Sequence, residues 1–200
     1  MTVDGKTKIL DAARRVISQY GSNRATLRSI AEEAGMSTGA IYHYYKNKNE
    51  VLYDVLDESL SDSAQIAKEV GKQDADKGKL SKEIIKRTEE RLRKDVENRL
   101  QHQFAHEVLS GNKDLQIKLH EKYTEWNEGI EEILKNLYGL EDPRMNKALS
   151  SWLLGAVDGV VLQMLLEVND NEIEDMMAIF EVLLEDGLPH FIKLLNEKKG

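Results

Sequence analysis

Side chains able to bind nucleic acid gather between residues 26 and 48, at the ends of two short predicted helices. Hydroxyl groups and free amides at a helix start bind phosphate, and an arginine can bind the O6 and N7 atoms of guanine together. A glycine lets the backbone approach the floor of a DNA groove. These chemistries together indicate DNA binding, and the candidate residues are Thr26, Arg28, Ser37, Thr38, Gly39, Tyr42, His43 and Lys48.

The sequence lacks the patterns that mark common enzyme sites. It contains no phosphate-binding loop, no Gly-x-Gly-x-x-Gly, no Gly-x-Ser-x-Gly and no His-Glu-x-x-His. It also contains no cysteine, which excludes disulfides, thiolate metal sites and cysteine nucleophiles. We therefore expect neither an enzyme nor a bound cofactor.

Apolar spacing and capping signals predict the elements that would position the candidate residues. A helix over 6–20 carries its apolar residues on one face. Thr26 is the N-cap of a second helix that ends at Gly35, and Ser37 is the N-cap of a third helix over 38–44. Two short helices joined by a tight turn are how a protein presents one helix to the DNA major groove.

The rest of the chain is predicted to be helical as well, because it has only two prolines and few β-branched runs. Asn47, with Glu50 three positions on, begins a helix that continues to about residue 67. A polar linker over 71–79 follows. Further helices are expected at about 80–109, 114–137, 145–168 and 172–197. We expect an all-α protein with a DNA-binding headpiece over 4–63 and an effector-binding and dimerisation bundle over 64–200.

The charge is divided unevenly along the chain. The whole chain has a formal net charge of −8. Residues 1–50 hold eight Lys and Arg against five Asp and Glu, a net charge of +3, which leaves −11 for the rest. A local basic face is enough to attract phosphates, while an acidic body disfavours non-specific binding to DNA.

Residues 6–60 resemble the DNA-binding headpiece of the TetR family of bacterial transcriptional regulators. The matching residues are Ile30-Ala31, Ala34-Gly35-Met36-Ser37, Gly39, Ile41-Tyr42, Tyr44-Tyr45, Lys48 and Val51-Leu52. The resemblance implies that Tyr42 contacts a phosphate and that Arg28 can reach a base edge. Lys48 lies at a helix start, where a cation is unfavourable unless a phosphate is its partner. His43 and Tyr44 vary across the family, so no operator sequence is predicted.

A duplex-reading protein of this size is expected to act as a two-fold dimer on a palindrome. The predicted helices over 145–168 and 172–197 are apolar around most of their circumference and must be covered on both sides. Packing inside one subunit would do this, and a four-helix interface between subunits would do it more easily. The candidate interface residues are Trp152, Ala156, Val160, Met164, Met177, Phe180 and Leu184.

The resemblance also implies that the middle helices enclose a pocket for a small organic effector. Aromatic walls with a few polar groups suit such a ligand, although each aromatic residue would serve equally well in an ordinary core. A carboxylate within an apolar helix needs a partner, either across the interface or in the pocket. The candidate lining residues are Phe104, Tyr123, Trp126, Trp152, Asp158 and Gln163.

Two alternatives compete with this interpretation. His102 and His106 are four residues apart, near Glu107 and His120, and could bind zinc in a metal-responsive regulator, although a solvated face explains them better. A helical protein-interaction module would bind without DNA and with little dependence on salt.

The sequence as a whole predicts a cytoplasmic, homodimeric transcriptional regulator, most simply a repressor that a small effector releases from a palindromic operator. We expect no membrane association. The first ten residues contain no apolar signal core, and the apolar segment 152–166 is too short and too polar to span a bilayer.

Overall fold

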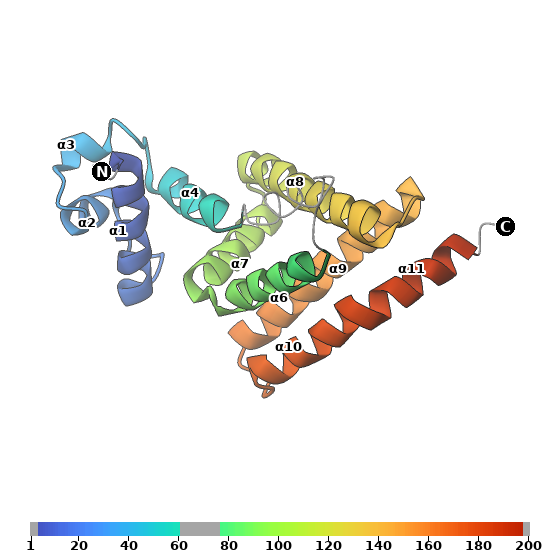
Figure 1. Ribbon diagram of the computed structural model, residues 1–200. Helices are drawn as coiled ribbons and strands as arrows, with labels where there is room; N and C mark the ends of the chain where they lie inside the picture. Colours follow the sequence, from blue (N-terminus) through green and yellow to red (C-terminus); the bar gives the residue numbers. More distant parts are fainter. Residues whose placement is uncertain (1–3, 61–76, 198–200) are drawn as a thin grey trace. The chain divides into compact units, whose positions relative to one another are not determined.

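The computed structural model describes residues 4–60 and 77–197, and every regular element in those ranges is helical (Figure 1). The chain divides into two compact units. The first runs to Leu60 and also takes in Asp95–His106, and the second holds the remaining residues. The all-α prediction is confirmed.

The first unit contains helices α1 (Gly5–Tyr20), α2 (Leu27–Glu33), α3 (Thr38–Ile41) and α4 (Lys48–Leu60). The apolar face of α1 is buried as its spacing predicts, with one exception: Tyr20 is 52% exposed. α3 is shorter than the predicted helix over 38–44, because the chain turns after Ile41. The predicted extension of α4 to about residue 67 lies outside the described residues.

The predicted helix over 80–109 is two helices, α6 (Lys77–Arg93) and α7 (Asp95–Leu109), separated by Lys94 alone. Asp95 and Glu97 lie in the first turn of α7, where carboxylates favour a helix start. The break lets α7 pack within the first unit, where the ring centroid of Phe104 lies 6.5 Å from that of Tyr53 on α4. An apolar pattern that continued through Lys94 could not predict this change of direction.

The second unit contains α6, α8 (Lys113–Tyr138), α9 (Pro143–Leu165), α10 (Ile173–Val182), the π-helical turn η1 (Leu183–Gly187) and α11 (Leu188–Glu197). Asn112 and Asp142 cap α8 and α9 with their side chains, and Gly139 ends α8 in the left-handed region at φ 75°.

The π turn explains how the last helices pass a proline. The amide of Leu188 donates to the Leu183 carbonyl, five residues back, directly before Pro189. The predicted helix over 172–197 therefore contains a widened turn, with α10, η1 and α11 following one another without an intervening loop.

Besides the packing of Leu80 on α6 against Ile133 and Leu137 on α8, two apolar clusters hold the second unit together. One joins α8, η1 and α11 through Leu134, Leu140, Leu184, Leu188 and Ile192. The other joins α6, α9 and α10 through Leu92, Val161 and Met177. Met177 and Leu184, which we predicted to lie in a subunit interface, are therefore part of the core of one chain.

Candidate nucleic-acid interface

Side-chain caps fix the two short helices of the first unit at their starts. The Thr26 hydroxyl oxygen accepts from the Ser29 amide at 3.0 Å, and the Ser29 hydroxyl oxygen accepts from the Thr26 amide at 3.0 Å. The Ser37 hydroxyl oxygen accepts from the Ala40 amide at 3.1 Å. Between these caps, Gly35 adopts φ +65°, a conformation that a β-branched residue would strain. Both predicted N-caps are confirmed.

Buried and exposed residues alternate around α3 and the turn that follows it. Ile41 is fully buried, and Tyr45 is 4% exposed with its hydroxyl donating to Asp54 Oδ2 at 3.0 Å. Tyr42 is 58% exposed. The other predicted DNA contacts here, Thr38, Gly39 and His43, are also exposed. The buried side chains of Ile41 and Tyr45 thus anchor α3, and the polar side chains beside them remain exposed to solvent.

Two of the predicted contacts already have partners within the chain. Arg28 on α2 pairs with Glu32 at 2.9 Å, and both side chains are largely exposed, so the pair is weak and a stronger acceptor would displace it. Lys48 Nζ donates to the Ser22 carbonyl at 3.2 Å. Lys48 therefore ties the start of α4 to the α1–α2 turn, a role that its position in the sequence did not predict.

Two cations at this surface were missed by the sequence-based selection. Arg24 and Lys46 are exposed, and neither side chain has an ion-pair or hydrogen-bond partner within residues 4–60 and 77–197. They lie in the turns before α2 and before α4. Their place in the turns beside the two short helices is the signal that could have indicated Arg24 and Lys46. This signal is weak because lysines and arginines are common on protein surfaces.

Tyr44 is 47% exposed, whereas its neighbour Tyr45 is buried. Its hydroxyl lies against Gly5, where even a methyl group would overlap it. The absence of a side chain at Gly5 therefore allows the Tyr44 ring to lie over the start of α1.

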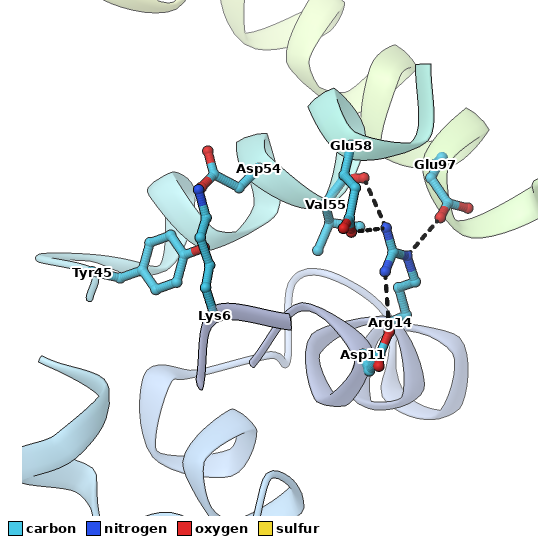
Figure 2. Close-up of polar contacts among 8 residues, drawn as sticks. All are labelled: Lys6, Asp11, Arg14, Tyr45, Asp54, Val55, Glu58 and Glu97. Carbon is cyan, nitrogen blue, oxygen red and sulfur yellow. Dashed lines mark hydrogen bonds and ion pairs between the residues drawn. The ribbon is translucent and has the colours of Figure 1, made fainter. Parts of the chain in front are cut away.

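Charged groups join α1, α4 and α7 within the first unit (Figure 2). Arg14 Nε donates to Glu97 Oε1 at 3.0 Å and Arg14 Nη2 donates to Glu58 Oε2 at 2.9 Å. Lys6 Nζ lies 2.8 Å from Asp54 Oδ2, and this hydrogen bond raises the pKa of Lys6.

The acidic partners also act on the basic and phenolic groups beside them. Burial lowers the pKa of Arg14, and the hydrogen bonds to Glu58 and Glu97 more than offset it, so the net pKa is raised. Burial, followed by the Asp54 carboxylate, raises the pKa of Tyr45 well above its ordinary value. These groups keep their usual charge states around neutral pH.

Three of the six predicted pocket residues meet in the second unit. The Tyr123 hydroxyl donates to Asp158 Oδ2 at 2.7 Å, and the Trp126 ring lies 4.9 Å from the Tyr123 ring. Arg91 Nη2 approaches Asp158 Oδ1 at 3.9 Å. Asp158 thus has the partners that a carboxylate in an apolar helix needs.

The other three lie elsewhere. Trp152 is 70% exposed. Gln163 is exposed, and its carbonyl oxygen accepts from Asn169 at 3.3 Å. Phe104 is buried in the first unit. The sequence could not separate Trp152 and Phe104 from Tyr123 and Trp126, because aromatic side chains line cores and pockets alike.

Two of the three buried residues of α9 are polar. Its buried residues include Asn146, which donates to the Glu131 carbonyl at 2.9 Å, and Ser150, which donates to Asn127 Oδ1 at 3.2 Å. Large apolar side chains of α9, α10 and α11 face outward instead. The most exposed of these are Trp152, Ile179, Val182, Phe191 and Leu194.

The candidate interface residues fall into two groups. Trp152 and Ala156 are exposed on α9, whereas Val160, Met164 and Phe180 are partly buried against the apolar cores. Of the described helices, α9 alone is long and apolar enough to cross a membrane by length and composition. Its middle nevertheless carries Asp158, bonded as described above.

The described residues contain no group of three His, Asp or Glu side chains placed to hold a metal ion. His106 and His120 are both exposed. The metal-responsive alternative therefore gains no support from the described part of the chain.

The geometry of α2, the Gly35 turn and α3 defines a helix-turn-helix protein of the kind that binds DNA. The sequence pattern of the bacterial regulatory proteins of the tetR family matches residues 9–55. An HTH-type transcriptional repressor of Mycobacterium tuberculosis is 35% identical over 66 residues, which make up 33% of this chain and 35% of the repressor. Residues 9–55 therefore carry a DNA-binding domain of the TetR family of bacterial regulatory proteins.

Two longer similarities extend beyond the headpiece. The fatty acid metabolism regulator protein of Bacillus subtilis is 28% identical over 149 residues, which are 72% of this chain and 68% of that protein. The structure of the fatty acid degradation regulator FadR from Bacillus halodurans superimposes with a TM-score of 0.69 at 23% identity, covering 94% of this chain and 98% of that one. That likeness shows a shared fold. By contrast, the chain matches only about a third of the length of the M. tuberculosis repressor.

Proposed function

We propose that this protein is a repressor that binds a palindromic DNA operator as a homodimer and leaves it when a small organic effector binds. The observation that carries the proposal is the contrast between Ile41 and Tyr45, which are buried, and Thr38, Tyr42 and His43, which are exposed beside them. A short helix pinned by apolar residues and exposing a polar edge suits a DNA groove. Such a regulator would act in the cytoplasm, where the chromosome lies.

The contacts divide into phosphate and base contacts. Thr26, Ser37, Tyr42, Lys46 and Arg24 are proposed to bind the phosphate backbone, which fixes the register on the duplex without reading sequence. Thr38, Gly39 and His43 would meet base edges in the major groove. Arg28 would exchange its pairing with Glu32 for a guanine, because a bidentate contact is stronger than an exposed ion pair.

A second copy of the chain is the proposed cover for the apolar side of α9, α10 and α11. A protein in water rarely leaves so many large apolar side chains exposed together. Two-fold pairing would bury the same surface of both copies. It would also provide two recognition helices, which must lie about 34–36 Å apart to enter successive major grooves.

The proposed effector site is the Tyr123, Trp126 and Asp158 cluster. Trp126 is 4% exposed, and its indole N–H has no acceptor within the described residues, so a ligand that accepts a hydrogen bond would satisfy it. The B. subtilis relative is a fatty acid metabolism regulator, which makes a fatty acid the first class to test. The ligand would need to prefer the state that does not bind DNA.

The chain's two tryptophans allow a direct effector test. In Trp152→Phe, Trp126 is the sole indole, so its fluorescence reports on the proposed site. Palmitate added to this variant should shift the Trp126 emission and saturate. If the emission of Trp126 stays constant while operator binding falls, the effector site lies elsewhere.

DNA binding is tested by selecting bound duplexes from a random pool at low ionic strength. We expect a palindrome, bound with an affinity that falls steeply as salt rises. Thr38→Asp should abolish selection, because a carboxylate there would face the groove; Lys147→Glu, which changes an exposed residue of α9, is the matched control. A chain that selects no palindrome, or binds without salt dependence, would be a protein-interaction module instead.

A further inference from the structure

Helix α7 has an unusual position in the chain. Its residues Asp95–His106 pack within the DNA-binding unit, yet both its neighbours in sequence, α6 and α8, belong to the other unit. Only Lys94 separates α6 from α7, and only residues 110–112 separate α7 from α8. A displacement of α6 or α8 must therefore reach α7 through very short connections.

Polar contacts attach α7 to the DNA-binding helices at two places. Near its start, Glu97 accepts a hydrogen bond from Arg14 of α1 at 3.0 Å. Near its end, Gln103 accepts one from the Ser22 hydroxyl in the α1–α2 turn. The Ser22 carbonyl in turn accepts from Lys48 at the start of α4. α7 thus contacts both the middle of α1 and the turn beside the proposed DNA surface.

Arg14 is suited to sensing the position of α7. Its planar guanidinium bonds Glu97 on α7 and Glu58 on α4 at the same time, while Asp11 on its own helix lies 3.3 Å away (Figure 2). Glu97 is 7% exposed, so it depends on its cation more than a surface carboxylate would. The guanidinium can hold both outer carboxylates only while α4 and α7 keep their spacing.

We propose that Arg14 couples the position of α7 to the DNA-binding helices, so that regulation passes through the Arg14–Glu97 ion pair. When α7 moves, Glu97 either pulls α1 with it or releases Arg14 to Glu58 and Asp11. Because those two partners remain, the release is reversible. This inference rests on the proposed function, since it concerns how operator binding is controlled.

Reciprocity supplies a test that needs no effector. If the position of α7 sets operator affinity, then operator binding must change α7 and its neighbours by the same coupling. We would measure hydrogen exchange with and without the selected operator duplex. In the natural chain, operator DNA should slow exchange in α6 and α8 as well as in the headpiece.

Three variants isolate the ion pair. Glu97→Gln and Arg14→Lys should reduce the operator-dependent slowing in α6 and α8 by at least about 5-fold, the lower range of allosteric coupling, while protection of α2 and α3 persists. Asp11→Asn is the matched control, because it removes a carboxylate of Arg14 without unlinking α7. A merely structural role would change overall stability and leave the transmitted effect in place.

A disulfide gives an independent check if Glu97→Gln unfolds. The chain has no cysteine, so Ser22→Cys combined with Gln103→Cys creates a single pair between two side chains that are in contact. Combined with Arg14→Lys, oxidation of this pair should restore the operator dependence of exchange in α6 and α8, and reduction should abolish it again. Undiminished transmission in Glu97→Gln, or in Arg14→Lys with the cysteines reduced if that variant unfolds, would overturn the inference alone. Failure of the natural chain to bind any duplex would overturn the proposed function with it.

Discussion

The two compact units differ in how completely they bury their apolar side chains. In the first, the apolar residues of α1, α2 and α4 are almost all buried, and the exposed exceptions are tyrosines, whose hydroxyls are compatible with water. In the second, α9 places polar Asn146 and Ser150 inward and leaves Trp152 outside. The first unit therefore hides its apolar surface within one chain. The exposed apolar side chains of the second unit support the proposed pairing with a second copy.

The largest expected effect tests whether Phe104 belongs to the headpiece. Phe104→Ala should destabilise the first unit by about 3–5 kcal/mol, because it empties a fully buried site beside Tyr53. Thermal unfolding followed by exchange in α1 and α4 measures this. If stability is unchanged and only effector binding weakens, Phe104 lines a pocket, as the sequence had suggested.

A charge introduced at Trp152 tests whether the exposed side of α9 joins two copies of the chain. Trp152→Glu should weaken self-association by roughly 2–4 kcal/mol, the range for a central tryptophan in an interface. Sedimentation velocity should then detect monomers at micromolar concentration, with the helical content retained because Trp152 is 70% exposed in one chain. Val161→Glu, at a buried position of the same helix, should instead unfold the second unit. Unaltered association of the Trp152 variant would show that another surface joins the copies.

A substitution of Arg28 distinguishes recognition of a particular base pair from general affinity for DNA. Arg28→Ala should lose about 1–3 kcal/mol of discrimination at one base pair and retain its affinity for unrelated duplexes. Glu32→Ala removes the partner of Arg28 without removing the arginine, and should leave discrimination intact or improve it. Competition binding with single-base operator variants distinguishes the two. Equal losses at every position would make Arg28 a phosphate contact.

Substitutions of Lys46 and Lys48 distinguish a phosphate contact from a contact within the headpiece. The Lys46 side chain has no hydrogen-bond or ion-pair partner within the described residues, so Lys46→Ala should shallow the salt dependence of operator binding by about one phosphate contact. Lys48→Ala should weaken all operators alike, and should also loosen the α1–α2 turn because Lys48 bonds the Ser22 carbonyl. If Lys48→Ala changes neither affinity nor the salt slope, its only role is within the headpiece.

The smallest effect concerns alkaline stability of the first unit. Burial and then Asp54 raise the pKa of Tyr45, so its neutral form is favoured in the folded state. Its contribution is complete below the unfolded pKa of about 10 and is lost as pH rises above it. Tyr45→Phe should therefore reduce the loss of stability between neutral and strongly alkaline pH. Lys6, whose pKa is also raised by Asp54, should account for part of the remainder.

Local signals explain what the sequence could predict. The caps at Thr26 and Ser37 and the helix end at Gly35 each depend on a few neighbouring residues, and they were predicted correctly. These features define the headpiece, so the class of protein could be inferred from them.

Features that depend on distant contacts could not be predicted in this way. The break at Lys94 and the assignment of α7 to the first unit depend on contacts such as Arg14–Glu97, which join residues 83 positions apart. α9 is apolar on nearly every side, so its periodicity could not indicate which side faces the core. The burial of Val161 and the partners of Asn146 and Ser150 identify that side.

Those two small polar residues have a consequence for assembly. Hydrogen bonds from Asn146 to the Glu131 carbonyl and from Ser150 to Asn127 fix how far α9 is rotated about its own axis. An aliphatic contact would tolerate sliding and rotation, whereas directional bonds do not. In the proposed symmetric pair, an error in that rotation would be repeated in both copies, so the fit between their apolar surfaces would depend on an asparagine and a serine.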